Sequence, residues 1–271
     1  MPFMNRTLIT QYTGGMGGGL GCSFTSDEPV PENHGGLESG TVIKGMTPCD
    51  VLTKVLYPYE YPRFTSFYID SQATLLEVGD KVTGGTRTFK WVIENSENLQ
   101  PSSISIIDLT ANSTLASNLA NDGTEDVDIG ADKQLTAPGV YSWQIKALDN
   151  KNDTFSKNFD VVWQYRVYWG ASPNETLTSD EVLNLAKNNL KSSFAGTYSF
   201  TVTDTTGDYF YIVYPDSWGD VNQAIDCDTS FGWDMENVGT VDVTNSFGVT
   251  VTYRLYRTTY KQTTDGCVNI S

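Results

Sequence analysis

The stretch from residue 153 to residue 170, DTFSKNFDVVWQYRVYWG, constrains the fold of this chain more than any other. It has no proline, and its only glycine is the last residue. Aromatic and β-branched residues occupy alternate positions along it, as on one face of a β-strand. These residues are Phe155, Phe159, Val161, Trp163, Tyr165, Val167 and Trp169. At ~3.3 Å per residue the strand would extend about 50 Å, well beyond the usual strand length. We therefore expect it to close one β-domain and to open the next across a stiff junction.

The residues before this long strand predict a β-sandwich over 63–163. Short alternations of apolar and polar residues are separated by turn residues at the spacing of a sandwich. In RTFKWVIEN, for example, Phe89, Trp91 and Ile93 share one parity. A domain of roughly one hundred residues in about seven strands, with tryptophans but no cysteine pair, favours an immunoglobulin-like or fibronectin-like module.

The residues after the long strand predict a second β-rich domain over 164–271 that carries one helix. Thr178 followed by Glu181 matches a capping box, and an apolar face follows, so we expect a helix over 179–190. Strands are expected after it, and the last two flank the sequence TNSFGV. Valines and aromatic residues alternate on both sides of that sequence, which predicts a hairpin.

Residues 1–62 are expected to form an extended N-terminal anchor that includes one short helix. The first 46 residues are rich in glycine and proline, and such a stretch buries too little surface to order itself without another surface. Thr47 and Pro48 then match the cap and the first position of a helix, and Asp50 lies where a carboxylate meets free backbone N–H groups. This pattern predicts a helix over 48–56.

The predicted helix has a narrow apolar stripe that needs a partner, because so short a helix is unstable alone. Two arrangements are open at this stage. The stripe packs on the first β-domain of its own chain, or it packs on sister copies or a docking partner, with the Tyr/Pro stretch 57–62 as a stiff spacer. The candidate oligomerisation and anchoring residues are Val51, Leu52, Val55, Leu56, Tyr57, Tyr59 and Tyr61.

The net charge of −16 opposes binding to nucleic acid or to an anionic membrane, because both would repel the chain. No apolar run is long enough to cross a bilayer, and MPFMNRTLITQYTGG lacks the apolar centre of a secretion signal. A chain without an export signal normally stays reduced. Free thiols are therefore favoured for Cys227 and Cys267, with a bridge between them as the alternative.

Few residues are suited to catalysis or to metal binding. The one histidine, His34, lies in the glycine- and proline-rich segment, which argues against a catalytic triad or a zinc site. The acidic loop 121–132 lacks the spacing of an EF-hand, so a solvated connection is favoured over a calcium loop. We therefore predict no enzymatic activity, no bound metal and no cofactor.

The connection 214–237 is the strongest candidate for ligand binding. It places acidic residues close in sequence to aromatic ones, a combination that glycosidases and sugar-binding loops use. The favoured interpretation is a long connection whose aromatic residues pack beneath it while its acidic residues stay in water. The candidate glycan-binding residues are Trp218, Trp233 and Asp234.

Three stretches carry a resemblance to a known family: GGLESGTVIKGMTPCDVLTKVLYPYEYP, YRVYWGASPNETLTSDEVLNL and VTNSFGVTVTYRLYRTTY. Together they resemble structural proteins of tailed bacteriophages of the fibre, collar and head-fibre kind. Such proteins attach to the capsid, neck or tail by their leader and project β-domains as homo-oligomers, often trimers. The resemblance implies attachment and oligomerisation through 35–62 and a distal domain over 165–271, and it supplies no catalytic motif.

With this resemblance, the sequence predicts a non-enzymatic virion protein that is assembled in the host cytoplasm. Residues 1–62 would bind capsid, neck or tail proteins, and a homotrimer is favoured. The alternative function is a host receptor or glycan-binding module. A glycan depolymerase ranks last, because such fibres usually need a long repetitive β-solenoid and the chain shows no internal repeat.

Overall fold

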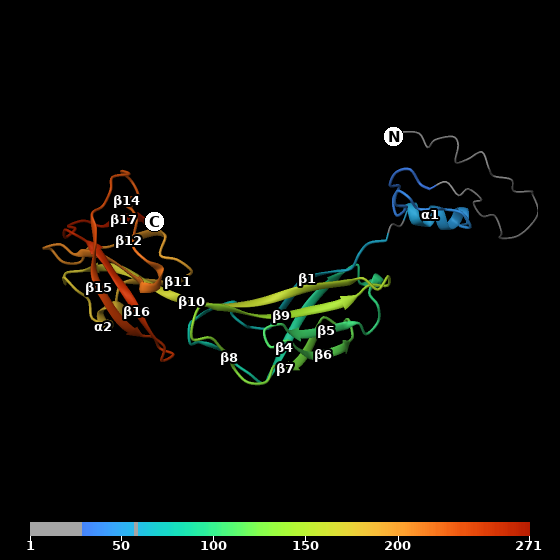
Figure 1. Cartoon of the computed structure of the whole chain (residues 1–271), viewed down its shortest axis with the longest axis horizontal. Coiled ribbons are helices and arrows are strands. Elements are labelled where there is room, and N and C mark those ends of the chain that lie inside the picture. The colour runs from blue at the N-terminus through green and yellow to red at the C-terminus, as the bar shows by residue number, and fades with distance from the viewer. Residues whose placement is uncertain (1–28, 57–58) are drawn as a thin grey trace, which may run out of the picture. The chain divides into compact units, whose positions relative to one another are not determined.

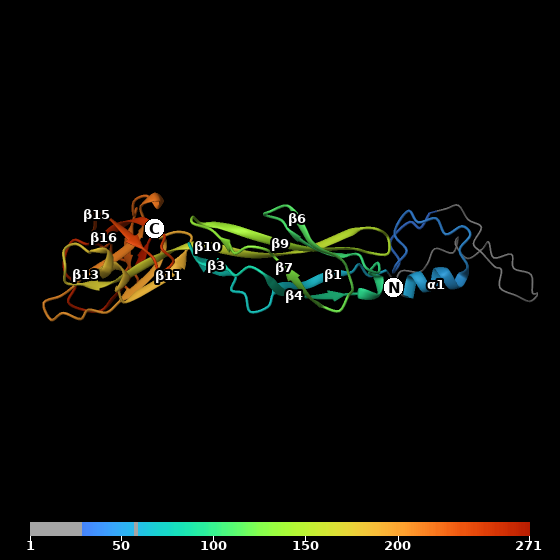
Figure 2. The ribbon, with the colours of Figure 1, turned by 90° about the horizontal axis from the view of Figure 1, so that it is seen from below.

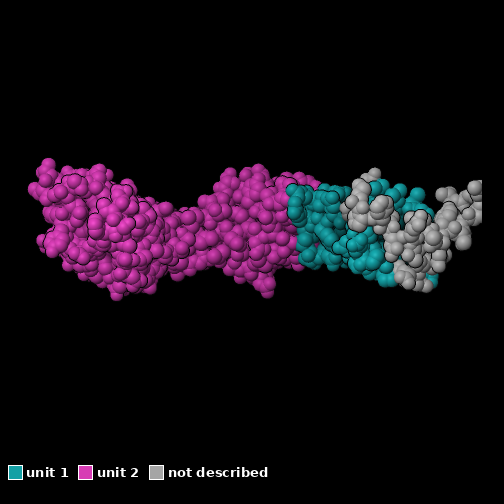
Figure 3. Space-filling model, turned by 90° about the horizontal axis from the view of Figure 1, so that it is seen from above, with its two compact units in different colours: residues 1–63, 93–100, 148–155 teal, residues 64–92, 101–147, 156–271 magenta. Residues whose placement is uncertain are grey.

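The computed structural model describes residues 29–56 and 59–271, and its architecture is mostly β, with one short helix near the N-terminus and several antiparallel sheets (Figure 1). This confirms the fold class predicted from the sequence. The chain divides into two compact units, which Figure 3 colours separately. Unit 1 holds the residues up to Arg63 together with Ile93–Gln100 and Leu148–Phe155, and unit 2 holds the rest.

In unit 1, helix α1 (Pro48–Leu56) has the predicted bounds. Two reciprocal bonds close its start: Asp50 N donates to Thr47 Oγ1 at 3.1 Å, and Thr47 N donates to Asp50 Oδ2 at 2.9 Å. Val51 and Val55 pack against a small buried cluster from the segment just before the helix. That cluster consists of Val30, Leu37 and Ile43. The helix therefore packs on the segment just before it in its own chain. Neither of the two arrangements considered from the sequence included this contact.

A glycine allows the leader to approach the helix this closely. Gly36 N donates to Lys54 O at 2.7 Å. Gly35 has a φ of +58°, and a Cβ placed on it would lie 2.2 Å from Val55 O. A side chain is therefore excluded at Gly35 by both its backbone conformation and the available space.

Residues 59–62, which follow the helix, bind to the loops of unit 1. The Tyr59 hydroxyl donates to Asp149 Oδ2 at 2.8 Å, and Asp149 is only 1% exposed. Lys151 Nζ lies 4.0 Å from the ring centroid of Tyr59 and 5.0 Å from that of Tyr61. Asn98 Nδ2 donates to Glu60 O at 2.9 Å. These contacts tie the strap of residues 59–62 to its neighbours within unit 1.

The central module is a sandwich of two sheets, as the sequence predicts. Buried residues of both sheets form its core, among them Phe67, Phe89, Trp143, Ile145 and Val161. One sheet has the order β1 (Arg63–Ile69), β4 (Thr86–Glu94) and β7 (Thr124–Asp128). The other contains β10 (Thr154–Ser172), β9 (Gly139–Leu148), β5 (Ile104–Asp108) and β6 (Ser113–Leu119). The short strand β2 (Leu75–Glu77) runs parallel to β10, and β3 (Lys81–Val82) pairs with β8 (Lys133–Gln134).

Strand β10 confirms the long strand predicted from the sequence. It is 19 residues long and belongs to a nine-stranded sheet that continues from the central sandwich into the C-terminal module (Figure 2). Its middle pairs with β2 at Trp163, and its end pairs with β13 (Tyr209–Pro215) from Tyr168 to Ser172. The two modules of unit 2 therefore share one unbroken strand.

The C-terminal module packs apolar residues on both faces of β13. Phe210, Ile212 and Tyr214 face one cluster, and Tyr211 and Val213 face another. The strands beside β13 in the large sheet are β16 (Thr250–Thr258) and β10, followed by β15 (Met235–Thr244) and β11 (Lys187–Lys191). A smaller sheet of β12 (Gly196–Phe200), β17 (Gly266–Ile270) and β14 (Ala224–Asp226) covers the first cluster. β15 and β16 form the hairpin predicted around TNSFGV.

The second helix is shorter than the sequence predicts. Helix α2 (Ser179–Leu183) starts with the expected capping box of Thr178 and Glu181. It ends at Leu183, a turn follows at 184–186, and residues 187–190 of the stretch predicted as helix 179–190 belong to β11 instead. Asn184 ends the helix, and Asn188 and Asn189 are weak helix formers. Pairing of β11 with Tyr165–Trp169 of β10 therefore prevails over the helical pattern.

An irregularity interrupts the last strand at one edge of the nine-stranded sheet. β15 forms that edge and pairs only with β16 within the described residues. The register shifts between Asn237 and Thr240, and Gly239 has a φ of +117°. The regular pairing of β15 with β16 is therefore broken midway along the strand.

Candidate functional site

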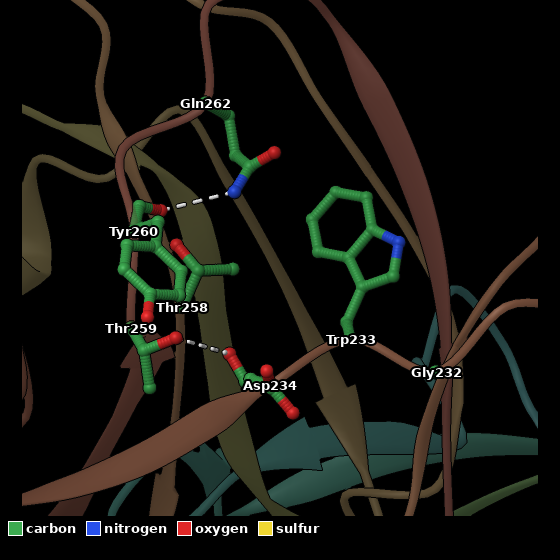
Figure 4. A pocket seen from close by; sticks show the side chains of 7 residues that line it. All are labelled: Gly232, Trp233, Asp234, Thr258, Thr259, Tyr260 and Gln262. Atoms are coloured by element: carbon green, nitrogen blue, oxygen red, sulfur yellow. Dashed lines mark hydrogen bonds between the residues drawn. The ribbon is translucent and has the colours of Figure 1, made fainter.

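A small open pocket in the C-terminal module is the candidate site (Figure 4). Its volume is about 200 Å³. One wall is the segment that leads into β15, and the other is the end of β16 with the residues that follow it. The lining residues are Gly232, Trp233, Asp234, Thr258, Thr259, Tyr260 and Gln262.

Backbone bonds fix the two walls against each other. Thr259 N donates to Asp234 O at 3.0 Å, and the Thr259 hydroxyl donates to the same oxygen at 3.4 Å. Gln262 exchanges two backbone bonds with the buried Asp208, at 2.7 and 2.9 Å. The Gln262 side-chain amide donates to Tyr260 O at 3.0 Å. These bonds position residues from two separate segments around one space.

Two aromatic rings and one hydrogen bond hold the Trp233 indole in place. Its ring makes edge contacts with Phe200 and Phe210, at centroid distances of 5.7 and 6.3 Å. Its Nε1 donates to Asp226 Oδ2 at 3.3 Å. A Cβ on Gly266 would approach the Trp233 ring to 3.0 Å, so the absence of a side chain there leaves room for the ring. The indole is thus preorganised as one wall of the pocket.

The charge beside the pocket is negative. Hydrogen bonds from the Thr229 backbone and hydroxyl, and then from the Asp228 backbone and Trp233, hold the pKa of Asp226 below its usual value. Asp226 is therefore ionised at neutral pH. The Asp234 carboxyl lines the pocket itself and is exposed. A bound anion would have to approach both carboxylates.

The structure separates Trp218 from the other two residues predicted to bind glycans. Trp218 is half-buried and packs near Tyr165 and Tyr214, with ring centroids 6.4 Å away in each case. Trp233 and Asp234 do line one pocket together. Two of the three predicted residues, Trp233 and Asp234, therefore line the pocket, and Trp218 lies outside it.

Five lining residues were not predicted from the sequence, and one of them, Gly232, lies in the connection 214–237. Thr258, Thr259, Tyr260 and Gln262 come from the end of a strand rather than from the connection 214–237. The one sequence feature that could have indicated this wall of the pocket is Tyr260, an aromatic residue among polar ones in RTTYKQTT. In the structure its side chain is 73% exposed.

The acidic residues of 214–237 are mostly engaged by neighbouring groups. Arg254 donates to Asp216 Oδ1 at 2.7 Å and also to Asp220. The Tyr256 hydroxyl donates to Asp220 at 2.8 Å, and Arg257 binds Glu236 at 2.8 Å. These carboxylates therefore have structural partners, whereas Asp234 is one of the residues that line the pocket.

The acidic loop 121–132 likewise supports the local structure. Asp126 accepts from the Thr88 hydroxyl at 2.6 Å, Asp132 accepts from Gly84 N at 2.8 Å, and Asp128 accepts from Gly130 N at 2.8 Å. Within residues 29–56 and 59–271, no group of three or more histidine, cysteine or acidic residues is arranged to hold a metal ion.

Cys227 and Cys267 form a disulfide, which corrects the expectation of free thiols. Their Cα atoms lie 5.4 Å apart, and Cys227 N also donates to Cys267 O at 3.1 Å. The bond links β17 to the turn after β14, which leads into the pocket wall. The pairing of β14 with β17 brings the two residues together, and this pairing is not visible in the spacing of the cysteines.

The residues predicted for oligomerisation and anchoring fall into different environments. Val51 and Val55 pack on the leader, whereas Leu52 and Leu56 are 56% and 58% exposed. Tyr59 is hydrogen-bonded to Asp149, and Tyr61 is 53% exposed. Tyr57 lies outside the described residues. Leu52 and Leu56 are thus the part of the stripe that the described residues leave uncovered.

No family model matches the sequence, and no curated protein matches it. Among solved structures, the chain is similar to the fibronectin(III)-like modules of Clostridium thermocellum CbhA, with 12% identity over 73% of this chain and 95% of that chain and a TM-score of 0.24. It is also similar to the Streptomyces avermitilis alpha-L-rhamnosidase complexed with L-rhamnose, with 12% identity over 78% of this chain but only 23% of that one and a TM-score of 0.25. No described helix is long and apolar enough to span a membrane.

Proposed function

We propose that this chain is a non-enzymatic structural protein of a bacteriophage virion, a fibre, collar or head-decoration component. Its N-terminal segment, residues 1–62, would attach it to capsid, neck or tail proteins. Its β-modules would project outward from that attachment, and the protein would assemble as a homotrimer in the host cytoplasm. The resemblance of three stretches of sequence to such proteins supports this assignment.

The observation that carries the proposal is the shared strand β10. A strand of 19 residues that is hydrogen-bonded in both modules leaves no linker between them. The contacts beside the strand add to this, since Asn245 Nδ2 donates to Val78 O at 2.6 Å and Val78 N donates to Gln164 O at 3.1 Å. A protein that projects its modules outward needs a connection without a linker, as the shared strand provides. Two independent binding modules could be joined by a flexible linker instead.

The attachment part of the proposal rests on Leu52 and Leu56. Two leucines more than half exposed on a short helix are a surface that association would cover. Burying them would contribute roughly 1.5–3 kcal/mol for each fully buried side chain, as an upper value. The helix is thus the proposed collar through which copies meet or dock.

The full chain carrying Leu52→Asp and Leu56→Asp tests this assignment. We expect the variant to lose its oligomer in light scattering and its incorporation into particles, while its thermal unfolding stays that of the parent. Thr53→Asp is the matched control, because it adds the same charge at an exposed position of the same helix. It is compared with the single variant Leu52→Asp, and it should leave assembly unchanged. Normal assembly of the double variant would show that the collar lies elsewhere.

A further inference from the structure

The pocket at Trp233 combines an aromatic ring with polar side chains, and a purely structural role does not require this combination. The Trp233 indole, which makes perpendicular ring contacts with Phe200 and Phe210, borders a space that polar side chains also line. Figure 4 shows the Trp233 ring and the Gln262 amide turned toward the same space. An aromatic face carries negative charge density, so it attracts the weakly positive C–H groups on the face of a sugar ring.

The size of the pocket limits its ligand to one ring. Pockets for drug-sized molecules usually have roughly 300–1,000 Å³. The volume here is about 200 Å³, which suits a single small ring whose neighbours extend into solvent. The open form of the pocket allows that ring to be the end of a longer chain.

The polar side chains select for hydroxyl groups. The Asp234 carboxylate only accepts hydrogen bonds, and the Gln262 side-chain oxygen is an acceptor, while one of the two Gln262 amide N–H groups is bound to Tyr260 O. The Thr259 hydroxyl is available as an acceptor as well, since it donates to Asp234 O. An acceptor-rich wall matches a ligand that presents several O–H donors.

The negative charge around the pocket limits the class of sugar that it can bind. Asp234 lines the pocket, and Asp226 lies at the N–H edge of the indole. The chain as a whole carries a net charge of −16. Uronic acids, sialic acids and phosphorylated sugars would be repelled by these carboxylates.

We propose that this pocket binds one uncharged sugar ring, stacked on the indole of Trp233 and hydrogen-bonded to Asp234 and Gln262. Tyr260, exposed at the rim, flanks the ring. Trp218 takes no part. The ligand is a terminal hexose or N-acetylhexosamine of a surface glycan. This inference goes beyond the proposed structural role and does not depend on assembly into a particle.

Saturation-transfer NMR on the full chain tests the proposal, with the methyl glycosides of glucose, galactose, mannose and N-acetylglucosamine and with glucuronic acid as probes. We expect transfer to the ring C–H protons of at least one uncharged glycoside and none to glucuronic acid. Trp233→Ala should weaken binding about tenfold or more, whereas the half-buried control Trp218→Ala should leave it unchanged.

Three results with the sugar probes would each overturn the proposal: no transfer to any uncharged glycoside, equal transfer to glucuronic acid, or equal losses in the two tryptophan variants. Binding of N-acetyltyrosinamide in place of the sugars would instead identify a peptide site and would also overturn it. Because Trp233 packs on Phe200 and Phe210, each variant is first checked by thermal unfolding. If Trp233→Ala fails to fold, Tyr260→Ala and Asp234→Ala at exposed positions decide the question by the same criterion.

Discussion

Arg166 donates two hydrogen bonds to one carboxylate oxygen of Glu77, from Nε at 2.8 Å and from Nη2 at 2.6 Å, across 89 residues of sequence. Glu77 ends β2, and Arg166 lies on β10 just beyond the segment that pairs with β2. The side chain of Glu77 is 8% exposed and that of Arg166 is 30% exposed. The pair therefore joins the central module to the part of β10 that enters the C-terminal module.

We predict that Arg166→Leu lowers the free energy of unfolding by about 3 kcal/mol, because it leaves the Glu77 carboxylate buried without its partner. Urea denaturation measures the change. Arg63→Leu is the control, since Arg63 makes the same kind of pair with Glu94 at side-chain exposures of 72% and 49%. That variant should change stability by no more than about 1 kcal/mol. Equal effects of the two substitutions would rule out a special role for the junction pair.

The disulfide should stabilise the C-terminal module. Removing it with Cys227→Ser and Cys267→Ser should cost about 2–4 kcal/mol, because the bond closes a loop between residues separated by 40 positions. Calorimetry with and without a reducing agent measures the loss. Cys49→Ser is the matched control, because Cys49 is a free and exposed thiol. An unchanged melting temperature after full reduction would contradict the prediction.

Tyr59→Phe should release the strap of residues 59–62. The substitution removes the hydroxyl that donates to the buried Asp149. We expect faster hydrogen exchange at residues 59–62 and at the loop around Asp149, because the strap loses one of its contacts. Tyr61→Phe, whose ring is 53% exposed, should leave exchange unchanged. Unaltered protection in Tyr59→Phe would mean that the other strap contacts suffice.

Stability should fall at alkaline pH through buried tyrosines. Burial, followed by the nearby Glu77, raises the pKa of Tyr168 to about 12. Burial also raises the pKa of Tyr211 to about 12, against the opposing effect of Arg257. Since the folded state keeps its proton where the unfolded chain has lost it, this stabilisation is complete below pH 10 and is lost between pH 10 and 12.

Tyr168→Phe tests this directly, because it keeps the ring and removes the titrating group. The decline in unfolding free energy between pH 10 and 12 should be shallower than in the parent by up to about 1.4 kcal/mol per pH unit. Guanidinium titrations at several pH values, with tyrosinate absorbance followed in parallel, measure it. A slope equal to that of the parent would show that other groups govern alkaline unfolding.

The parts of the fold that depend on local pattern could be predicted from the sequence. The cap formed by Thr47 and Asp50, the capping box at Thr178 and the alternation along β10 each act within a few residues. The end of α2 could not be found in this way. It depends on the pairing of β11 with a strand some twenty residues earlier, and such long-range pairing leaves little trace in a single sequence.

The same limit applied to the candidate site. Trp218 and Trp233 lie in one connection and look equivalent in sequence, but one packs beside Tyr165 and the other borders the pocket. Tyr260 and Gln262 come from beyond the next hairpin, so no spacing rule joins them to Trp233. The disulfide was missed for a different reason. Free thiols were expected from the cellular compartment, and the spacing of the two cysteines in the sequence does not show that the fold brings them together.

The break in β15 near Gly239 has a consequence for crowding. An uninterrupted outer strand offers a row of free N–H and C=O groups on which a neighbouring molecule could add a strand of its own. The shift between Asn237 and Thr240 disrupts that row at its midpoint. Copies of the chain at high local concentration would therefore pair less readily along this edge.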